Sequence, residues 1–137
     1  MPNEIGKGTV FLTTEEVLEL HALAIARDGT HGGVLDRNLL ESAVATPRQT
    51  VGGRPSHPTL EAVAAAYWFH IAMNHPFVDG NKRTAVLACI RFLELNGLDL
   101  DFSTDDYVRL GLAVASGKLG KAELTAEIEN HLIPFGD

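Results

Sequence analysis

The chain has 137 residues, with 45% hydrophobic and 21% charged residues, which is an ordinary globular composition. Its formal net charge of −7 disfavours a broad nucleic-acid or membrane surface, because an acidic surface repels both. The single cysteine, Cys89, excludes an internal disulfide, and the apolar stretches are too short to span a bilayer. We expect one domain over residues 1–137, with a core of about 12–132, an extension at 1–11 and a cytoplasmic location.

The first two predicted elements are helices. Thr13 and Glu16 fit a capping box at the start of the first, and Gly29 is expected to end it. Asp36 is expected to cap a short second helix, which Pro47 limits because the residue before a proline disfavours helical geometry.

Residues 47–58 form the one long loop, and two central helices follow it. The first of them is predicted from about 59 to 74 and the second from about 81 to 96, with residues 75–80 between them. Both contain long apolar runs, and helices that are hydrophobic on all sides are buried in a core. The sequence therefore predicts a buried helical hairpin.

The remaining chain is predicted to be helical apart from an extended link at 99–102. Ser103 and Asp106 offer a capping pair for a helix that stops near Gly117. A last helix is expected over about 121–132. The expected fold is therefore all-α, with about six helices and little or no sheet.

The segment from His75 to Thr84 reads His-Pro-Phe-Val-Asp-Gly-Asn-Lys-Arg-Thr and joins the two central helices. Lys82 and Arg83 fall in the first turn of the following helix, where each opposes the helix dipole by about 0.3–1 kcal/mol. Two cations placed beside the free N–H groups of a helix start form a site for an anion, and a polyphosphate suits it best.

Neighbouring residues could complete such a site. Gly80 lets the backbone approach a ligand closely, Asp79 can supply an oxygen ligand to Mg²⁺, and Asn81 can bond to the same ligands. His75 titrates near neutral pH and can accept a proton from an attacking hydroxyl. Phe77 is expected to point inward and anchor the loop.

The same residues allow a plainer interpretation, in which Asp79 pairs with Arg83 and His75 is an ordinary loop histidine. No Gly-x-x-x-x-Gly-Lys-[Ser/Thr] P-loop occurs in the sequence. His70 and His75 do not have the spacing of a zinc hydrolase helix. Composition and spacing alone leave the two interpretations open.

The segment resembles the Fic/Doc superfamily signature, His-x-Phe-x-[Asp/Glu]-[Gly/Ala]-Asn-[Gly/Lys]-Arg, and is more similar to the death-on-curing (Doc) toxin branch. That branch reads His-x-Phe-x-Asp-[Ala/Gly]-Asn-Lys-Arg-Thr-Ala, as residues 75–85 do here. The resemblance covers roughly residues 12–132. It implies a compact bundle of about six helices around a buried helical hairpin.

The resemblance also implies a role for each motif residue. His75 would be the general base, Asp79 would hold Mg²⁺, and Arg83 would join them as the third catalytic residue. The ATP phosphates would be bound by residues at the start of the second central helix: Gly80, Asn81, Lys82, Arg83 and Thr84. Residues 47–58 would occupy the place of a flap that aligns the target segment.

Two departures from AMP-transferring members bear on the reaction. Those members carry Gly at the position of Lys82 and a second Arg at the position of Val86, and both differences would change how ATP lies. The Doc branch implies that the γ-phosphate faces the attacking hydroxyl, so that the protein is an ATP-dependent Ser/Thr protein kinase. It further implies a growth-arresting toxin with a translation elongation factor as target and a small cognate antitoxin as partner.

Three alternatives remain: transfer of AMP or another nucleotide from the same site, a non-catalytic module that binds antitoxin or nucleotide, and a metal hydrolase. Residues 125–130 also fit an inhibitory pattern of some Fic proteins. The second Arg, with which the Glu of that pattern pairs, is absent here.

Overall fold

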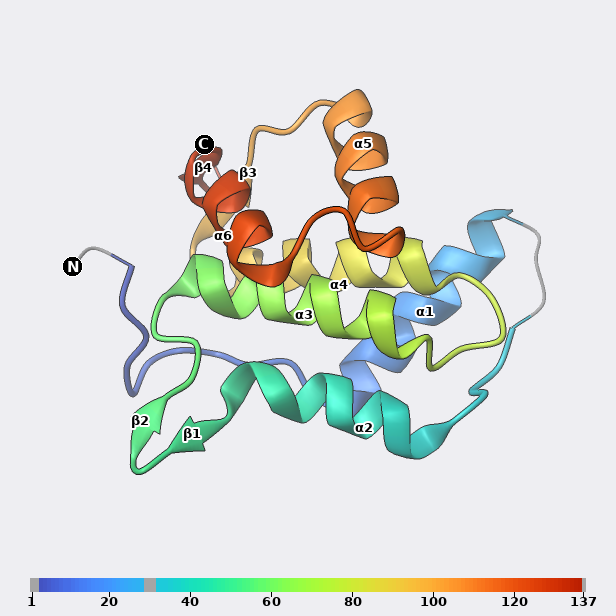
Figure 1. The fold of residues 1–137 in the computed structure, drawn as a ribbon, viewed down its shortest axis with the longest axis horizontal. Coiled ribbons are helices and arrows are strands. Elements are labelled where there is room, and N and C mark those ends of the chain that lie inside the picture. The colour runs from blue at the N-terminus through green and yellow to red at the C-terminus, as the bar shows by residue number, and fades with distance from the viewer. Residues whose placement is uncertain (1–2, 29–31, 137) are drawn as a thin grey trace.

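The computed structural model describes residues 3–28 and 32–136, and helices dominate it (Figure 1). Over these ranges the chain forms six α-helices: α1 Thr14–Asp28, α2 Arg37–Ala45, α3 Leu60–Asn74, α4 Asn81–Leu95, α5 Thr104–Ala115 and α6 Lys121–Glu129. The other named elements are short: the 3-10 helix η1 Thr46–Arg48 and the strands β1 Thr50–Val51, β2 Arg54–Pro55, β3 Leu98–Leu100 and β4 Leu132–Pro134. The predicted all-α class is confirmed.

Helices α3 and α4 form the centre of the fold and pack side by side (Figure 1). α3 is apolar around most of its circumference, and it buries the two largest core side chains, Tyr67 and Trp68. Phe92 of α4 meets Tyr67 with ring centroids 5.4 Å apart. The predicted buried hairpin is therefore present, and the loop at its turn carries the motif from His75 to Thr84.

The other four helices cover this central pair. α1 packs on α4, while α2 and α6 pack on opposite sides of α3 (Figure 1). α5 contacts both central helices and buries Leu110 and Val114. No described helix combines the length and the apolar character that crossing a bilayer requires.

Side-chain caps fix the starts of α1 and α2 where the sequence predicted them. Thr13 N–H donates to Glu16 Oε1 at 2.8 Å, and Glu16 N–H donates to the Thr13 hydroxyl at 3.1 Å. The Asp36 carboxylate accepts from Leu39 N–H at 3.0 Å. Each bond satisfies an N–H group that has no partner within its helix, which stabilises the first turn. Gly29, the predicted end of the first helix, lies outside the described residues.

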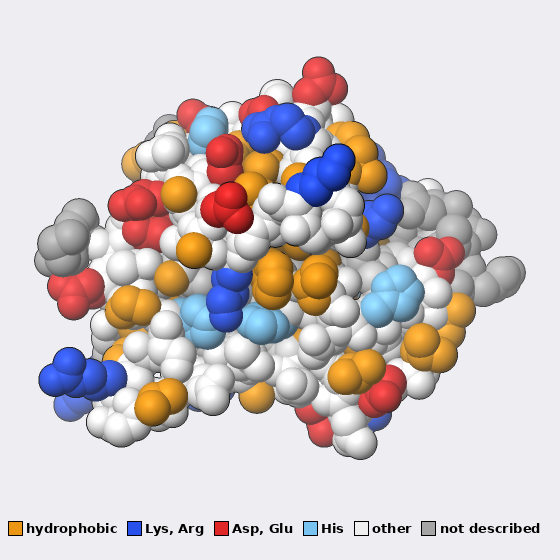
Figure 2. Space-filling model, viewed as in Figure 1, with side chains coloured by type: hydrophobic (Ala, Val, Ile, Leu, Met, Phe, Trp, Pro, Cys, Tyr) orange, Lys and Arg blue, Asp and Glu red, His pale blue; other side chains and the backbone are white. Residues whose placement is uncertain are grey.

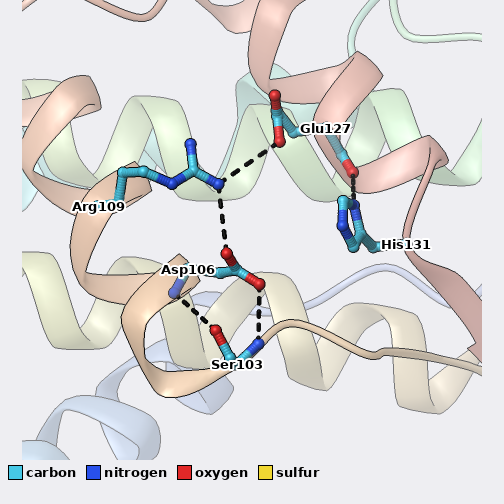
Figure 3. Close-up of polar contacts among 5 residues, drawn as sticks. All are labelled: Ser103, Asp106, Arg109, Glu127 and His131. Carbon is cyan, nitrogen blue, oxygen red and sulfur yellow. Dashed lines mark hydrogen bonds and ion pairs between the residues drawn. The ribbon is translucent and has the colours of Figure 1, made fainter.

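The start of α5 is capped in the same way and is linked to α6 (Figure 3). Ser103 and Asp106 exchange two hydrogen bonds, at 3.0 and 3.1 Å. The Arg109 guanidinium lies 3.4 Å from Asp106 and 3.9 Å from Glu127 of α6. Because exposed ion pairs are worth at most about 1 kcal/mol, this bridge adds little to the stability of the fold.

Two segments expected to be irregular or helical form strands instead. Residues 47–58 contain the β1–β2 hairpin, whose turn residues Gly52 and Gly53 both have positive φ, as a two-residue hairpin turn requires. β3 and β4 pair as antiparallel strands, so the last helix ends at Glu129 and not near residue 132. Pairing between distant segments overrides the local helical pattern at this point.

Candidate active site

The candidate site begins at His75, where α3 ends. His75 has φ 52° and ψ 53°, and it is the one described non-glycine residue with a positive φ. The left-handed conformation costs an ordinary residue about 1–2 kcal/mol, and Pro76 promotes the departure from helical geometry. This bend turns the chain out of α3 and leaves the His75 side chain exposed.

Phe77 and Asn81 close the loop onto α4. The Phe77 side chain is fully buried, as the sequence predicted. Its N–H donates to Asn81 Oδ1 at 2.9 Å, and its carbonyl accepts from Asn81 Nδ2 at 2.9 Å. Both ends of the Asn81 amide are therefore used inside the loop.

The segment 33–36, between α1 and α2, lies along the motif. Leu35 N–H donates to the Pro76 carbonyl at 2.8 Å, and Val78 N–H donates to the Gly33 carbonyl at 3.0 Å. These backbone bonds hold the motif loop against the segment that precedes α2. The sequence offered no sign of them, since they join backbone groups of segments about 40 residues apart.

The structure does not bring the predicted flap, residues 47–58, to the motif. The β1–β2 hairpin precedes α3 and lies at the other end of that helix (Figure 1). The 15 residues of α3, at about 1.5 Å each, separate the two ends by roughly 22 Å. Residues 33–36 take the position beside the motif instead.

Asp79 and Gly80 form the turn into α4. Gly80 has φ 81°, and a Cβ there would lie 3.2 Å from Cγ2 of Ile25, so both conformation and space favour glycine. The exposed Asp79 carboxylate accepts from Gly80 N–H at 2.8 Å through Oδ1. The Asp79 carbonyl lies 2.8 Å from Nε2 of His21 in α1. The turn thus presents a carboxylate to solvent while α1 holds its backbone.

The start of α4 presents two cations, as the sequence predicted. The first backbone hydrogen bond runs from Thr84 N–H to the Gly80 carbonyl at 2.9 Å, and a helix leaves the N–H groups before that point without an intrahelical acceptor. Lys82 and Arg83 are both exposed next to these groups. This combination of N–H groups, helix dipole and positive side chains favours a phosphate ligand.

A groove of about 900 Å³ passes over the motif. Its lining comes from α3, the motif loop, α4 and α5: Ala72, His75, Asp79, Gly80, Asn81, Lys82, Arg83, Val86, Thr104, Tyr107, Val108, Gly111, Leu112 and Ala115. The volume lies within the range of about 300–1,000 Å³ that is typical of small-molecule sites. The groove therefore has room for a nucleotide, and His75 is one of the residues that line it.

The wall formed by α5 was not predicted as part of the site. Val108 and Leu112, four residues apart, are each 56% exposed and line the groove. Burial raises the pKa of Tyr107 in the same wall, so its phenol keeps its proton and can donate a hydrogen bond. The sequence signal that could have indicated this wall is that α5 has two apolar faces. Leu110 and Val114 form the buried face, and Val108 and Leu112 form the exposed one.

Asn81 and Thr84 differ from the other predicted site residues. Asn81 is 4% exposed and its side chain is already bonded to the loop. Thr84 is fully buried and does not line the groove, and its hydroxyl has no hydrogen-bond partner among the described residues. Contact between Thr84 and a cofactor stays a prediction, and it would require that side chain to leave the core.

The groove offers Asp79 as a metal ligand. Among the described residues, no group of three or more His, Cys, Asp or Glu side chains is arranged to hold a metal ion. Mg²⁺ does not require such a group, because it retains water and phosphate oxygens and takes one or two carboxylates from a protein. One exposed carboxylate beside two cations and the N–H groups of a helix start fits this metal.

The predicted inhibitory pattern at 125–130 lies away from the groove. Glu129 is exposed on α6, and no residue of α6 is among the described residues that line the groove. Glu127, in the same helix, faces Arg109 of α5 instead (Figure 3).

A second ionisable cluster lies outside the groove. Lys121 Nζ is 3.0 Å from Nε2 of His57 and 3.0 Å from Nε2 of His70. Figure 2 shows basic and histidine side chains gathered on this face, beneath α6. Burial, then the Lys121 charge and then His57 lower the pKa of His70 to about 4, and burial followed by Lys121 lowers that of His57. Both imidazoles are therefore neutral acceptors for the lysine.

The sequence model of the Fic/DOC family matches residues 11–93 of the chain. The chain belongs to the Fic/DOC family. It is 39% identical to "Toxin Doc" of Mycolicibacterium smegmatis over 122 residues, which cover 88% of this chain and 92% of that protein. It is 30% identical to "Protein kinase doc" of Escherichia phage P1 over 108 residues, 79% of this chain and 84% of that protein.

Proposed function

We propose that the protein is a Doc-type toxin that transfers the γ-phosphate of ATP to a Ser or Thr hydroxyl of another protein. The observation that carries the proposal is the convergence of His75, Asp79, Lys82 and Arg83 on one groove at a helix start. The printed names of the two relatives, a toxin and a protein kinase, support the same class of activity.

In this proposal each residue has a defined chemical task. The target hydroxyl gives its proton to the His75 imidazole while its oxygen bonds to the γ-phosphorus, and the bond from that phosphorus to the bridging oxygen breaks to release ADP. Lys82, Arg83 and the N–H groups of α4 stabilise the negative charge on the phosphate oxygens. Asp79 would hold Mg²⁺, which would supply further positive charge to the phosphate oxygens.

The wall beside Lys82 supports phosphoryl transfer over AMP transfer. Val86, at the position where AMP-transferring members carry a second Arg, lines the groove with an apolar side chain. The Lys82 side chain also occupies space that Gly leaves open in those members. Both differences argue for another placement of the triphosphate.

The proposal includes two protein partners and a cytoplasmic location. The target is a translation elongation factor, as the family resemblance implies. A small antitoxin would cover the apolar surface formed by Val108 and Leu112, because exposed apolar side chains beside a site are typical of protein interfaces. The net charge of −7 disfavours nucleic acid and membrane as partners.

The proposal is tested by incubating the protein and Mg²⁺ with a purified elongation factor and ATP labelled at either the γ- or the α-phosphate. We expect label on the factor from γ-labelled ATP only. Replacing His75 with Ala should reduce the rate by about 10²–10⁴-fold, which is the usual contribution of a general base. His131→Gln, which changes a histidine outside the groove, should leave the rate unchanged.

Other results select the alternatives. Label from α-labelled ATP alone would show nucleotide transfer. If neither ATP labels the factor and His75→Ala remains as toxic to cells as the wild type, the protein is a non-catalytic binding module.

A further inference from the structure

His21 reaches the motif from a different helix. It lies in α1, 58 residues before Asp79 in the sequence, and is only 5% exposed. Its Nε2 is 2.8 Å from the Asp79 carbonyl oxygen. Because a carbonyl oxygen can only accept, this ring nitrogen must carry the proton and donate it. The contact therefore fixes both the tautomer of His21 and the direction of the Asp79 carbonyl.

The His21 ring is also held in place by packing. It stacks on Phe77 with ring centroids 3.7 Å apart and an interplanar angle of 6°. A Cβ added to Gly32 would lie 3.1 Å from the ring, and one added to Gly80 would lie 3.6 Å from it. The imidazole thus contacts the motif at Phe77 and at Asp79, and it lies beside Gly80.

We propose that His21 is a positioning residue for the metal- and phosphate-binding turn, an inference that rests on the proposed function. The peptide between Asp79 and Gly80 carries the carbonyl that His21 binds and the N–H that the Asp79 carboxylate binds. Rotation of this peptide would move the Asp79 carboxylate and the Gly80 backbone that leads into the first turn of α4 together. His21 prevents that rotation by holding the carbonyl against α1.

A purely structural role predicts something different. An aromatic hydrocarbon would fill the space and stack on Phe77 as well as an imidazole does, without the cost of burying a polar ring. The feature that only a donor supplies is the bond to the Asp79 carbonyl. Positioning therefore depends on the donor, whereas stability depends mainly on the ring.

Two variants separate the donor from the ring. His21→Phe keeps the ring and removes the donor, whereas His21→Gln keeps an N–H donor near the Nε2 position and removes the ring. A non-hydrolysable ATP analogue is titrated into each protein by calorimetry, with and without Mg²⁺, and the unfolding temperature is measured in parallel. Labelling of the elongation factor is followed as a function of Mg²⁺ concentration.

We expect His21→Phe to reduce the Mg²⁺-dependent gain in affinity for the analogue by about tenfold. The Mg²⁺ concentration for half-maximal activity should rise by about the same factor. This is the low end of the effects seen for groups that orient a metal ligand. Its unfolding temperature should fall less than that of His21→Gln, because the ring that stacks on Phe77 is kept although the Asp79 carbonyl loses its donor. His21→Gln should recover the Mg²⁺ dependence despite a lower unfolding temperature. A wild-type Mg²⁺ response in His21→Phe, or no recovery in His21→Gln, overturns the inference.

Failure of the proposed function gives a different pattern. If the wild-type protein binds no nucleotide, the proposed function is rejected. The positioning role of His21 is then tested by measuring the hydrogen-exchange rate of the Gly80 amide by NMR. Faster exchange in His21→Phe and wild-type exchange in His21→Gln would still support positioning. Equal exchange rates in all three proteins would reject it.

Discussion

Two residues of the motif, His75 and Gly80, hold the backbone in the left-handed region, and each does so for its own reason. His75 has φ 52° at the end of α3, and its side chain needs this bend to project into the groove. Strain of this kind is found where a site needs a particular side-chain direction. Gly80 has φ 81°, a backbone conformation that residues with a side chain rarely adopt. It also lies against Ile25, which leaves little room for a Cβ.

We expect Gly80→Ala to destabilise the protein by more than the about 1–2 kcal/mol that left-handed geometry alone costs, because its Cβ would lie 3.2 Å from Ile25. Gly117→Ala is the matched control, since Gly117 has φ 80° and no atom within 4 Å of an added Cβ. Urea unfolding of both variants measures the difference. Equal losses would show that Ile25 gives way and that packing at Gly80 is not limiting.

At the level of elements, local signals were predictable from the sequence and long-range pairing was not. The caps at Thr13, Asp36 and Ser103 involve residues three positions apart, so a short sequence window contains both partners. β3 and β4 are more than 30 residues apart, and neither carries a strong strand pattern. The last helix was predicted too long for this reason.

The candidate site follows the same rule. The contiguous run from His75 to Arg83 was predictable because its unusual cations and turn residues are adjacent in sequence. The α5 wall and the His21 contact were not, since they depend on how α1 and α5 pack on the central hairpin. The helical phase of α4 places the Thr84 side chain in the core, and its contact with a cofactor stays a prediction.

The attachment of α6 to α3 should depend on pH. Lys121 lies between His57 and His70, and the pKa of His70 is lowered to about 4, from 6.5, chiefly by burial. As the pH falls below about 6.5, the unfolded chain therefore binds protons before the folded chain does. The stability that these histidines contribute is complete above that pH and is lost as the pH falls toward 4.

We expect the unfolding temperature to fall over this window and to fall less in His70→Gln, which offers Lys121 an acceptor that does not titrate. His131→Gln serves as the control and should retain the wild-type slope. Unfolding followed by circular dichroism at pH 7, 6, 5 and 4 makes the measurement. A His70→Gln curve parallel to the wild type would place the acid sensitivity elsewhere.

At the scale of the whole molecule, residues 3–12 are part of the packed structure. The Asn96 side chain donates to the Val10 carbonyl and accepts from its N–H, both at 2.9 Å. Leu12 is buried, and its N–H donates to the Tyr67 hydroxyl at 2.9 Å. The N-terminal segment is thereby tied to both central helices.

We expect Tyr67→Phe to lower the free energy of unfolding by about 1–3 kcal/mol, because it leaves the buried N–H of Leu12 without an acceptor. Burial raises the pKa of Tyr67 to about 12, so the phenol is neutral and the loss should not vary between pH 6 and 9. Denaturant unfolding at several pH values provides the test. An unchanged midpoint would mean that water reaches the Leu12 amide and replaces the hydroxyl.

The placement of the motif at the turn of the buried α3–α4 hairpin has a consequence for genetics. The side chains of His75, Val78, Asp79, Lys82 and Arg83 are exposed, whereas those of Phe77, Asn81 and Thr84 are built into the core. Spontaneous mutants that survive expression of the gene should therefore fall into two groups. One group would accumulate full-length protein altered at an exposed position, and the other would lose the protein to degradation.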